Sequence, residues 1–374
     1  MITPTLHYLT DIFFEPGIVG QTRAICGHLE IHRPLIVTDS GILELGLTQH
    51  LELGSAPVFS NVRPNPTAED VEAGLAAYRE HACDGVVGFG GGSPIDCAKA
   101  ISLLATHSDP LESYAMIHGG AARITANKPP VVAIPTTAGT GSEVGRAALI
   151  SFGSGKKLAI IGKSIIPDAA VCDPELTLNL PPFLTAATGM DALSHCVETF
   201  CSPRFNPVAD AIAMDGLRRA WKSLPRVMDD PGNMGLRSAM MMASTEGALA
   251  FQKGLGLIHS LSHPLGSLPD KPLHHGTLNA IFLPHVVRFN GPTCREKLQS
   301  MAESMDVKPD PDSVADAFQS LIGSLGLPLR LRDIGVSETD LQFIPGAALR
   351  DHSTPSNPRP FTESDCSEIL RQAW

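Results

Sequence analysis

Two kinds of hydrophobic periodicity divide this 374-residue chain. Between residues 34 and 177, short runs rich in Val and Ile alternate with segments whose apolar residues recur at helical spacing. From residue 178 such runs become few and the pattern is helical. Strands that alternate with helices indicate a mostly parallel sheet covered on both faces. The chain has more residues than usually fold around one hydrophobic core, so two domains are expected. The change of pattern predicts an α/β domain over 1–177 and an all-helical domain over 178–374.

Individual elements follow from the same patterns. Buried strands are expected at 34–39, 84–90, 129–137 and 168–174. A helix is expected over 67–82, with Thr67 as its N-cap and acidic residues in its first turn. Residues 145–161 predict a β-hairpin that turns at 153–155. Helices in the second part are expected at 183–201, 207–223, 235–253, 255–267, 293–304 and 312–325.

Composition narrows the class of protein. The chain is 43% hydrophobic and 18% charged with a net charge of −11, which is typical of a soluble globular protein. Its basic residues form no stripe and it has only three Tyr and two Trp, so we expect no nucleic-acid partner. No run approaches 18 apolar residues, and the N-terminus lacks a secretory pattern. We therefore expect a cytoplasmic protein without a membrane partner, whose eight cysteines are reduced.

A glycine-rich turn joins a strand to a helix within "VVGFGGGSPIDCAKAISLLA", residues 86–105. Gly90, Gly91 and Gly92 allow a ligand to approach the backbone closely. Ser93 is expected to cap a helix that begins at Pro94, and the free N–H groups at such a helix start can hold a pyrophosphate. The turn does not match G-x-G-x-x-G, because Ser93 stands at the last glycine, and a purely structural turn is an alternative.

A second loop, "PTTAGTGSE" at 135–143, also follows a strand and is rich in hydroxyl groups. Two such loops at the carboxyl ends of parallel strands favour one nucleotide site. Asp39 ends another predicted strand and could accept hydrogen bonds from a ribose, or could simply cap a turn.

Histidines and an aspartate at i,i+4 spacing indicate a metal site in the second part. Asp191 and His195 are one such pair, and His259 and His263 are another. Pairs at this spacing project from one face of a helix, and a carboxylate with imidazoles suits Zn²⁺ or Fe²⁺. Each histidine taken alone could equally be a hydrogen-bonded core or surface residue.

Taken together, these motifs resemble those of the iron-containing (group III) alcohol dehydrogenases, which have a dehydroquinate synthase-like fold. The resemblance covers nearly the whole chain. It is carried by "PNPT" (64–67), "GGGSPIDCAKA" (90–100), "PTTAGTGSEV" (135–144), "DPELT" (173–177), "TGMDALSHCVE" (188–198) and "GLGLIHSLSHPLG" with "HGTLNA" (254–280). It implies an N-terminal α/β domain for NAD(P) and a helical C-terminal domain that holds one divalent metal.

The resemblance also implies site residues. The metal ligands would be Asp191, His195, His259 and His275. Fe²⁺ is the first candidate for the bound ion, and Zn²⁺ is the alternative. His263 would lie near the substrate, and we expect it to act as the catalytic proton relay, whereas His274 matches no family role. The residues expected to touch the dinucleotide are Asp39, Asn65, Gly91, Gly92, Ser93, Pro94, Thr136, Thr137, Thr140 and Lys157.

An activity follows from this set. The resemblance implies a dehydrogenase that oxidises a small primary alcohol or hydroxy acid, or reduces the aldehyde, as a homodimer or higher homo-oligomer. Asp39 would repel a 2′-phosphate, so NAD is favoured over NADP. Arg146, Lys271 and His274 depart from the usual pattern and add positive charge, which suggests an anionic substrate such as 4-hydroxybutyrate. The alternative is that Arg146 pairs with a structural carboxylate.

Other members of the same fold are the remaining alternatives. Maleylacetate reductases lack the metal set that is complete here, and dehydroquinate synthases and glycerol dehydrogenases use different metal motifs. A further alternative is a protein of this fold that binds a nucleotide or metal without catalysis. Such a protein would not reduce NAD⁺ with any alcohol of a test panel, whereas a dehydrogenase would.

Overall fold

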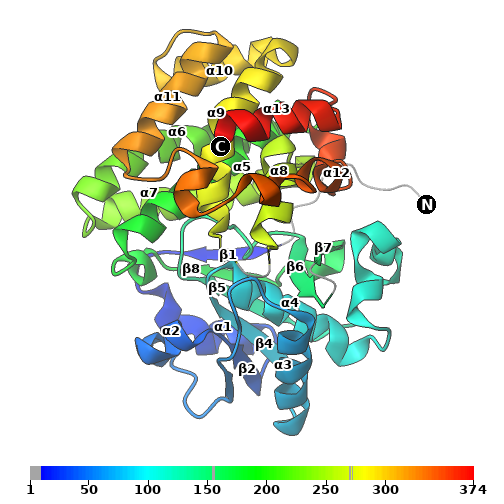
Figure 1. The fold of residues 1–374 in the computed structure, drawn as a ribbon. Helices are drawn as coiled ribbons and strands as arrows, with labels where there is room; N and C mark the ends of the chain where they lie inside the picture. Colours follow the sequence, from blue (N-terminus) through cyan, green and yellow to red (C-terminus); the bar gives the residue numbers. More distant parts are fainter. Residues whose placement is uncertain (1–9, 154–155, 269–270, 272) are drawn as a thin grey trace. The chain divides into compact units, whose positions relative to one another are not determined.

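A computed structural model describes residues 10–153, 156–268, 271 and 273–374 (Figure 1). Contacts between residues separate two units. Of the described residues, the sheet unit comprises those up to Thr137 together with Gly141–Asn179, and the helical unit comprises Ala138–Thr140 with Leu180–Trp374. The predicted domains, 1–177 and 178–374, remain a prediction about which parts fold independently.

The sheet unit is built on six strands in the order β1-β8-β5-β4-β2-β3, and every neighbouring pair is parallel. The strands are β1 (Asp11–Phe14), β2 (Pro34–Val37), β3 (Val58–Phe59), β4 (Gly85–Gly90), β5 (Val131–Pro135) and β8 (Ala169–Cys172). The four predicted strands are therefore confirmed as β2, β4, β5 and β8. The predicted hairpin is also confirmed, as the antiparallel pair β6 (Ala147–Phe152) and β7 (Lys156–Ile161); Ser154 and Gly155 of its turn lie outside the described residues.

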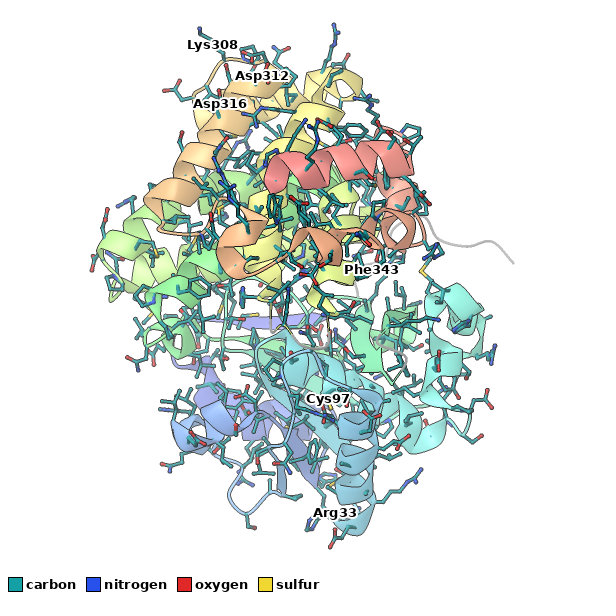
Figure 2. The ribbon with its side chains drawn as sticks, in the orientation of Figure 1. Arg33, Cys97, Lys308, Asp312, Asp316 and Phe343 are labelled. Carbon is teal, nitrogen blue, oxygen red and sulfur yellow. The ribbon has the colours of Figure 1, made fainter. Side chains whose placement is uncertain are left out.

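Hydrophobic cores lie on both faces of the sheet. Successive side chains of a strand point to opposite faces, so one strand contributes to both cores. Leu35 and Val37 of β2 pack into one core, and Ile36 between them packs into the other. The first core includes α3 (Ala68–Glu80) and α4 (Gly92–Thr106), and the second includes α1 (Thr22–His28). Figure 2 shows Cys97 on α4, where its side chain is fully buried in the first core.

Helix α3 begins where the sequence predicts. Thr67 accepts a hydrogen bond from the N–H of Asp70, and the Asp70 carboxylate accepts one from the N–H of Thr67. This reciprocal capping box satisfies two N–H groups that a helix start otherwise leaves free. The predicted N-cap is confirmed.

The helical unit contains α5 (Pro182–Cys201), α6 (Pro207–Asp229), α7 (Met234–Ala250), α8 (Leu257–Gly266), α9 (His275–Asn290), α10 (Arg295–Met305), α11 (Pro311–Ser324), α12 (Ile344–Ala348) and α13 (Glu363–Ala373). Six of these match the predicted segments. The prediction omitted α12, α13 and α9, and α9 is buried on most sides and so lacks a polar face. None of the described helices is long and apolar enough to cross a membrane.

Close packing around α5 decides where its polar side chains meet the other helices. A Cβ atom on Gly276 of α9 would lie 2.2 Å from the carbonyl oxygen of Ala187 on α5. One on Gly247 of α7 would lie 3.2 Å from the Cβ of His195. Glycine at these positions thus lets α7 and α9 approach α5 directly.

Candidate functional site

Three helices of the helical unit bring the predicted metal ligands together. Asp191 and His195 on α5 and His259 on α8 each offer a donor atom, and these atoms lie within 4.8 Å of one another. All three residues are buried, and the most exposed of them is only 4% accessible. His275, the first residue of α9, is placed at the edge of this group, with its Nε2 3.8 Å from Oδ1 of Asp191 and 27% of its side chain exposed. All four residues predicted as ligands are therefore neighbours.

Glu198, which was not predicted from the sequence as a site residue, orients one of these donors. It lies two turns beyond Asp191 on α5, and its Oε2 is 2.6 Å from Nδ1 of His259. Its Oε1 accepts a hydrogen bond from the N–H of Ile258 at 2.6 Å, so the same carboxylate caps the start of α8. A carboxylate on Nδ1 leaves Nε2 of His259 as the nitrogen that faces the other donors. The i,i+7 spacing of Asp191 and Glu198 was the sequence signal.

Asn279 is a second residue of the site that was not predicted. It lies one turn after His275 on α9 and is fully buried. Its amide nitrogen is 2.7 Å from Oδ1 of Asp191, 3.1 Å from Nε2 of His275 and 3.2 Å from Nε2 of His259. This amide links donors from all three helices, and its i,i+4 spacing from His275 was the available signal.

The protonation state of His259 suits a cation. Burial, followed by the proximity of His195 and His263, lowers the pKa of His259 well below its ordinary value, so its imidazole is neutral. Burial raises the pKa of Glu198 to about 7, although hydrogen bonds from Ile258 and Gly256 oppose the shift. Neutral imidazoles and a carboxylate are the donors that Zn²⁺ and Fe²⁺ accept. The donor set therefore fits one such ion.

His263, the predicted catalytic residue, lies beside these donors. It follows His259 by one turn of α8, and their ring centroids are 5.5 Å apart. Its Nδ1 is 2.9 Å from Oδ2 of Asp351, a partly buried partner that was not predicted from the sequence. The structure thus separates His263 from the Asp191 group and pairs it with another carboxylate.

The residues expected to add positive charge differ in their surroundings. Lys271 forms an ion pair with Asp340 and donates to the carbonyl oxygen of Gly335, so its charge is neutralised within the helical unit. His274 packs edge-on against Phe183, and burial lowers its pKa, which keeps the ring neutral. The expectation of positive charge from these two residues is wrong, because one is paired and the other is uncharged. Arg146 belongs to the sheet unit and is partly exposed.

The glycine turn of the sheet unit corrects one detail of the prediction. Helix α4 begins at Gly92 with Gly91 as its N-cap, so Ser93 is not the cap and Pro94 is not the first residue. Ser93 Oγ instead accepts a hydrogen bond from the N–H of Asn65 at 3.2 Å. The helix start has no side-chain cap among the described residues, which leaves its N–H groups directed at the turn. Such a start fits a pyrophosphate.

Several predicted cofactor residues gather at this turn. Lys157 Nζ donates to Oδ1 of Asn65 at 2.7 Å, and Asn65 in turn meets Ser93. A Cβ atom on Gly91 would lie 3.8 Å from Oγ1 of Thr137. The N–H of Thr136 donates to the carbonyl oxygen of Gly90 at 2.9 Å. These residues come from β4, the start of α4, the loop after β5, β7 and the loop before α3, so only the folded unit brings them together.

Asp39 caps a short helix and also borders the glycine turn. Its Oδ1 accepts from the N–H of Ile42 at 2.9 Å, so it caps α2 (Ser40–Glu44). Its Oδ2 would lie 3.4 Å from a Cβ on Gly90, so the carboxylate also borders the glycine turn. Thr140, by contrast, belongs to the helical unit.

A buried lysine behind the turn was also missed. Lys99 of α4 is 1% exposed and donates to Oγ of Ser142 and to the carbonyl oxygen of Ala147, both at 2.8 Å. Asp96, one turn earlier, accepts from Ser142 Oγ at 2.5 Å. This pair ties α4 to the segment that precedes β6. An ion pair at i,i+3 on an otherwise apolar helix was its sequence signal.

Comparison with known families matches both halves of the chain. The model "Iron-containing alcohol dehydrogenase" matches residues 10–174. The model "Fe-containing alcohol dehydrogenase family, C-terminal" matches residues 185–374. The two matches together cover most of the sequence.

Similar proteins agree with these matches. A 4-hydroxybutyrate dehydrogenase from Cupriavidus necator is 46% identical over 98% of this chain and 99% of its own length. The crystal structure of a 1,3-propanediol oxidoreductase has a TM-score of 0.92 at 37% identity, covering 99% of this chain and 100% of that one. A sulfoacetaldehyde reductase from Bifidobacterium kashiwanohense, solved in complex with NAD⁺, has a TM-score of 0.89 at 29% identity, covering 100% of this chain and 99% of that one. The chain therefore belongs to the iron-containing alcohol dehydrogenase family and is an oxidoreductase.

Proposed function

We propose that this protein is an NAD-dependent and divalent-metal-dependent alcohol dehydrogenase that also reduces the corresponding aldehyde. The observation that carries the proposal is the buried group of Asp191, His195 and His259, with His275 at its edge, in a chain of this family. Burying a carboxylate among imidazole rings is costly unless its polar groups have partners, and Nδ1 of His195 has no hydrogen-bond partner among the described residues.

Metal binding is assigned to these four residues, with Fe²⁺ as the first candidate and Zn²⁺ as the second. Glu198 and Asn279 hold the donors in place through their hydrogen bonds. When bound, the cation would lower the pKa of the substrate hydroxyl and polarise the carbonyl of the product.

The glycine turn of the sheet unit is proposed to hold NAD. The N–H groups at the start of α4 would bind the pyrophosphate, with Asn65, Thr137 and Lys157 beside it. Pro94, Thr136 and Thr140 belong to the same proposed set. Asp39 borders the turn and would repel a 2′-phosphate, which favours NAD over NADP. The solved relative in complex with NAD⁺ supports this assignment.

His263 is proposed to accept the proton that leaves the alcohol oxygen as the carbinol carbon gives its hydride to the nicotinamide. Its position beside His259, outside the group of donors, supports this role. A positioned histidine typically contributes about 10²–10⁴-fold to such a step.

The proposed substrate is a small primary alcohol that carries an anionic group, such as 4-hydroxybutyrate, with succinic semialdehyde as the product. The similarity to a 4-hydroxybutyrate dehydrogenase and to a sulfoacetaldehyde reductase supports an anionic substrate. Arg146 adds a positive charge that departs from the usual pattern, and it is our candidate for the anionic group.

An alcohol panel tests these assignments. Protein reconstituted separately with Fe²⁺ and Zn²⁺ is assayed for NAD⁺ reduction with 4-hydroxybutyrate, 1-butanol and 1,4-butanediol. We expect kcat/KM to be at least tenfold higher for 4-hydroxybutyrate than for 1-butanol, and Arg146→Met to abolish this preference. Equal values for all three alcohols would contradict the anionic substrate, and no NAD⁺ reduction with any alcohol or metal would contradict the activity.

Two variants separate the roles of the histidines. His259→Ala should lose bound metal, whereas His263→Asn should retain it and lower kcat. Loss of metal in His263→Asn would make His263 a ligand instead of a relay. We also propose a cytoplasmic homodimer or higher homo-oligomer, as expected from the family resemblance, which sedimentation equilibrium would test.

A further inference from the structure

Asp351 and His352 form a polar group with His263 that the proposed function leaves unexplained. Both residues lie in the segment between α12 and the short helix Thr354–Ser356. Oδ2 of Asp351 is 2.9 Å from Nδ1 of His263 and 3.6 Å from Nδ1 of His352. Oδ1 of the same carboxylate accepts from the N–H of Ser353 at 2.8 Å. Asp351 is thus held by its own loop and directed at α8.

This carboxylate is ionised at neutral pH. Burial raises its pKa, but the proximity of His263 and His352 and the hydrogen bonds to His263 and Ser353 outweigh burial, so the pKa of Asp351 lies below its ordinary value. An ionised carboxylate can only accept hydrogen bonds. The 2.9 Å contact therefore requires that Nδ1 of His263 carries a proton.

The other nitrogen of His263 faces a different environment. Nε2 is buried and has no hydrogen-bond partner among the described residues. The ring lies nearly parallel to that of His275, with centroids 5.5 Å apart and planes at 7°, and it also approaches His259. The ring of His352 lies 5.2 Å from it at 16°. His263 is therefore restricted in rotation, and Nε2 lies on the side away from Asp351.

We propose that Asp351 is a positioning residue that holds His263 in the tautomer with its proton on Nδ1, so that Nε2 is the nitrogen available to the substrate. The tautomer follows from contacts within the helical unit alone. Its catalytic consequence rests on the proposed function, in which the proton of the alcohol oxygen passes to Nε2. The imidazolium that results would keep its Nδ1 hydrogen bond and be stabilised by the charge of Asp351.

The tautomer is measured directly, without any assay of activity. Zn²⁺-loaded protein with ¹⁵N-labelled histidine is examined by long-range ¹H–¹⁵N correlation, and the signal of His263 is assigned by its loss in His263→Asn. We expect the pattern of an Nδ1–H tautomer in the unmodified protein and its loss or mixing with the Nε2–H pattern in Asp351→Asn, because an amide can donate to Nδ1. An Nε2–H pattern in the unmodified protein would overturn the proposal, whether or not the variant folds.

Kinetics test the consequence. With 4-hydroxybutyrate, Asp351→Asn should lower kcat at least tenfold while KM and bound Zn²⁺ stay within about twofold, and Asp351→Glu should recover part of kcat. The control is Asp365→Asn, since Asp365 only caps α13 and its loss should leave kcat and the tautomer unchanged. Unchanged kcat in Asp351→Asn, with His263→Asn impaired, would overturn the positioning role alone. Failure of the proposed function would instead appear as absent NAD⁺ reduction in the unmodified protein.

Discussion

A single carboxylate and a single amide hold the proposed donor residues of this protein in place. Glu198 touches His259 and the start of α8, and Asn279 touches Asp191. Each is almost fully buried, so each has few alternative partners. The proposed donors are therefore oriented by hydrogen bonds from neighbouring buried groups, and proteins commonly tune metal affinity through such bonds.

Replacing Glu198 tests this orientation. We expect Glu198→Gln to weaken Zn²⁺ binding about 10–100-fold, because the uncharged amide no longer fixes the proton on Nδ1 of His259. Competition with a chelator of known affinity measures the change. Glu246→Gln on α7 is the control, since the Glu246 carboxylate pairs with Arg219 instead of with a donor histidine. Equal weakening in both variants would argue for a general loss of stability instead.

At the scale of elements, the contact between α5 and α9 determines whether His275 reaches Asp191. Gly276→Ala should destabilise the protein by about 1–3 kcal/mol, because its Cβ would lie 2.2 Å from the carbonyl oxygen of Ala187 and would separate the helices. Urea denaturation measures this change. In Gly323→Ala on α11 the added Cβ meets nothing within 4 Å, and a gain of up to about 1 kcal/mol is expected. Similar effects at both glycines would contradict the role of close packing.

Helix α9 also carries a partly buried histidine that is expected to make stability depend on pH. Burial, aided by the charge of Arg288, lowers the pKa of His285 to about 4 from 6.5. Because the pKa of His285 is lower in the folded state, the unfolded chain binds the proton first as the pH falls. The contribution of neutral His285 to stability is therefore complete above pH 6.5 and is lost as the pH falls towards 4. Compared with the unmodified protein, His285→Gln should lose less stability between pH 6.5 and 4. Urea midpoints across this range measure it, and an unchanged slope would contradict the effect.

For the whole molecule, metal and cofactor are expected to stabilise different units. Zn²⁺ should slow amide hydrogen exchange in α5, α8 and α9, because its donors come from these three helices. NAD⁺ should slow exchange at the start of α4 and near Thr137. Saturation at about 100 times Kd corresponds to about 2.7 kcal/mol of added stability. Exchange measured by mass spectrometry with each ligand separately, and with a chelator, checks this. Zn²⁺ protection confined to the sheet unit would contradict the assignment of the metal.

The sequence alone determined the class of fold and the candidate donors. The Val and Ile runs at β2, β4, β5 and β8 and the N-cap of α3 depend on neighbouring residues, so local patterns were sufficient to predict them. The pairs at i,i+4 on α5 and α8 likewise follow from helix geometry. The start of α4 was misplaced by two residues, because Gly91 and Gly92 continue the turn into the helix and Ser93 is used by Asn65.

Only the tertiary structure decided which polar groups meet. Glu198 lies 61 positions before His259, which it contacts. Asn279 lies 88 positions after Asp191, and Asp351 lies 88 positions after His263. Such contacts depend on how closely the helices pack. Glycines such as Gly276 allow two helices to approach each other, and no local sequence pattern predicts where this happens. The pairing of Lys271 with Asp340 was invisible for the same reason. Periodicity identifies the faces of helices, whereas packing selects the partners that each face meets.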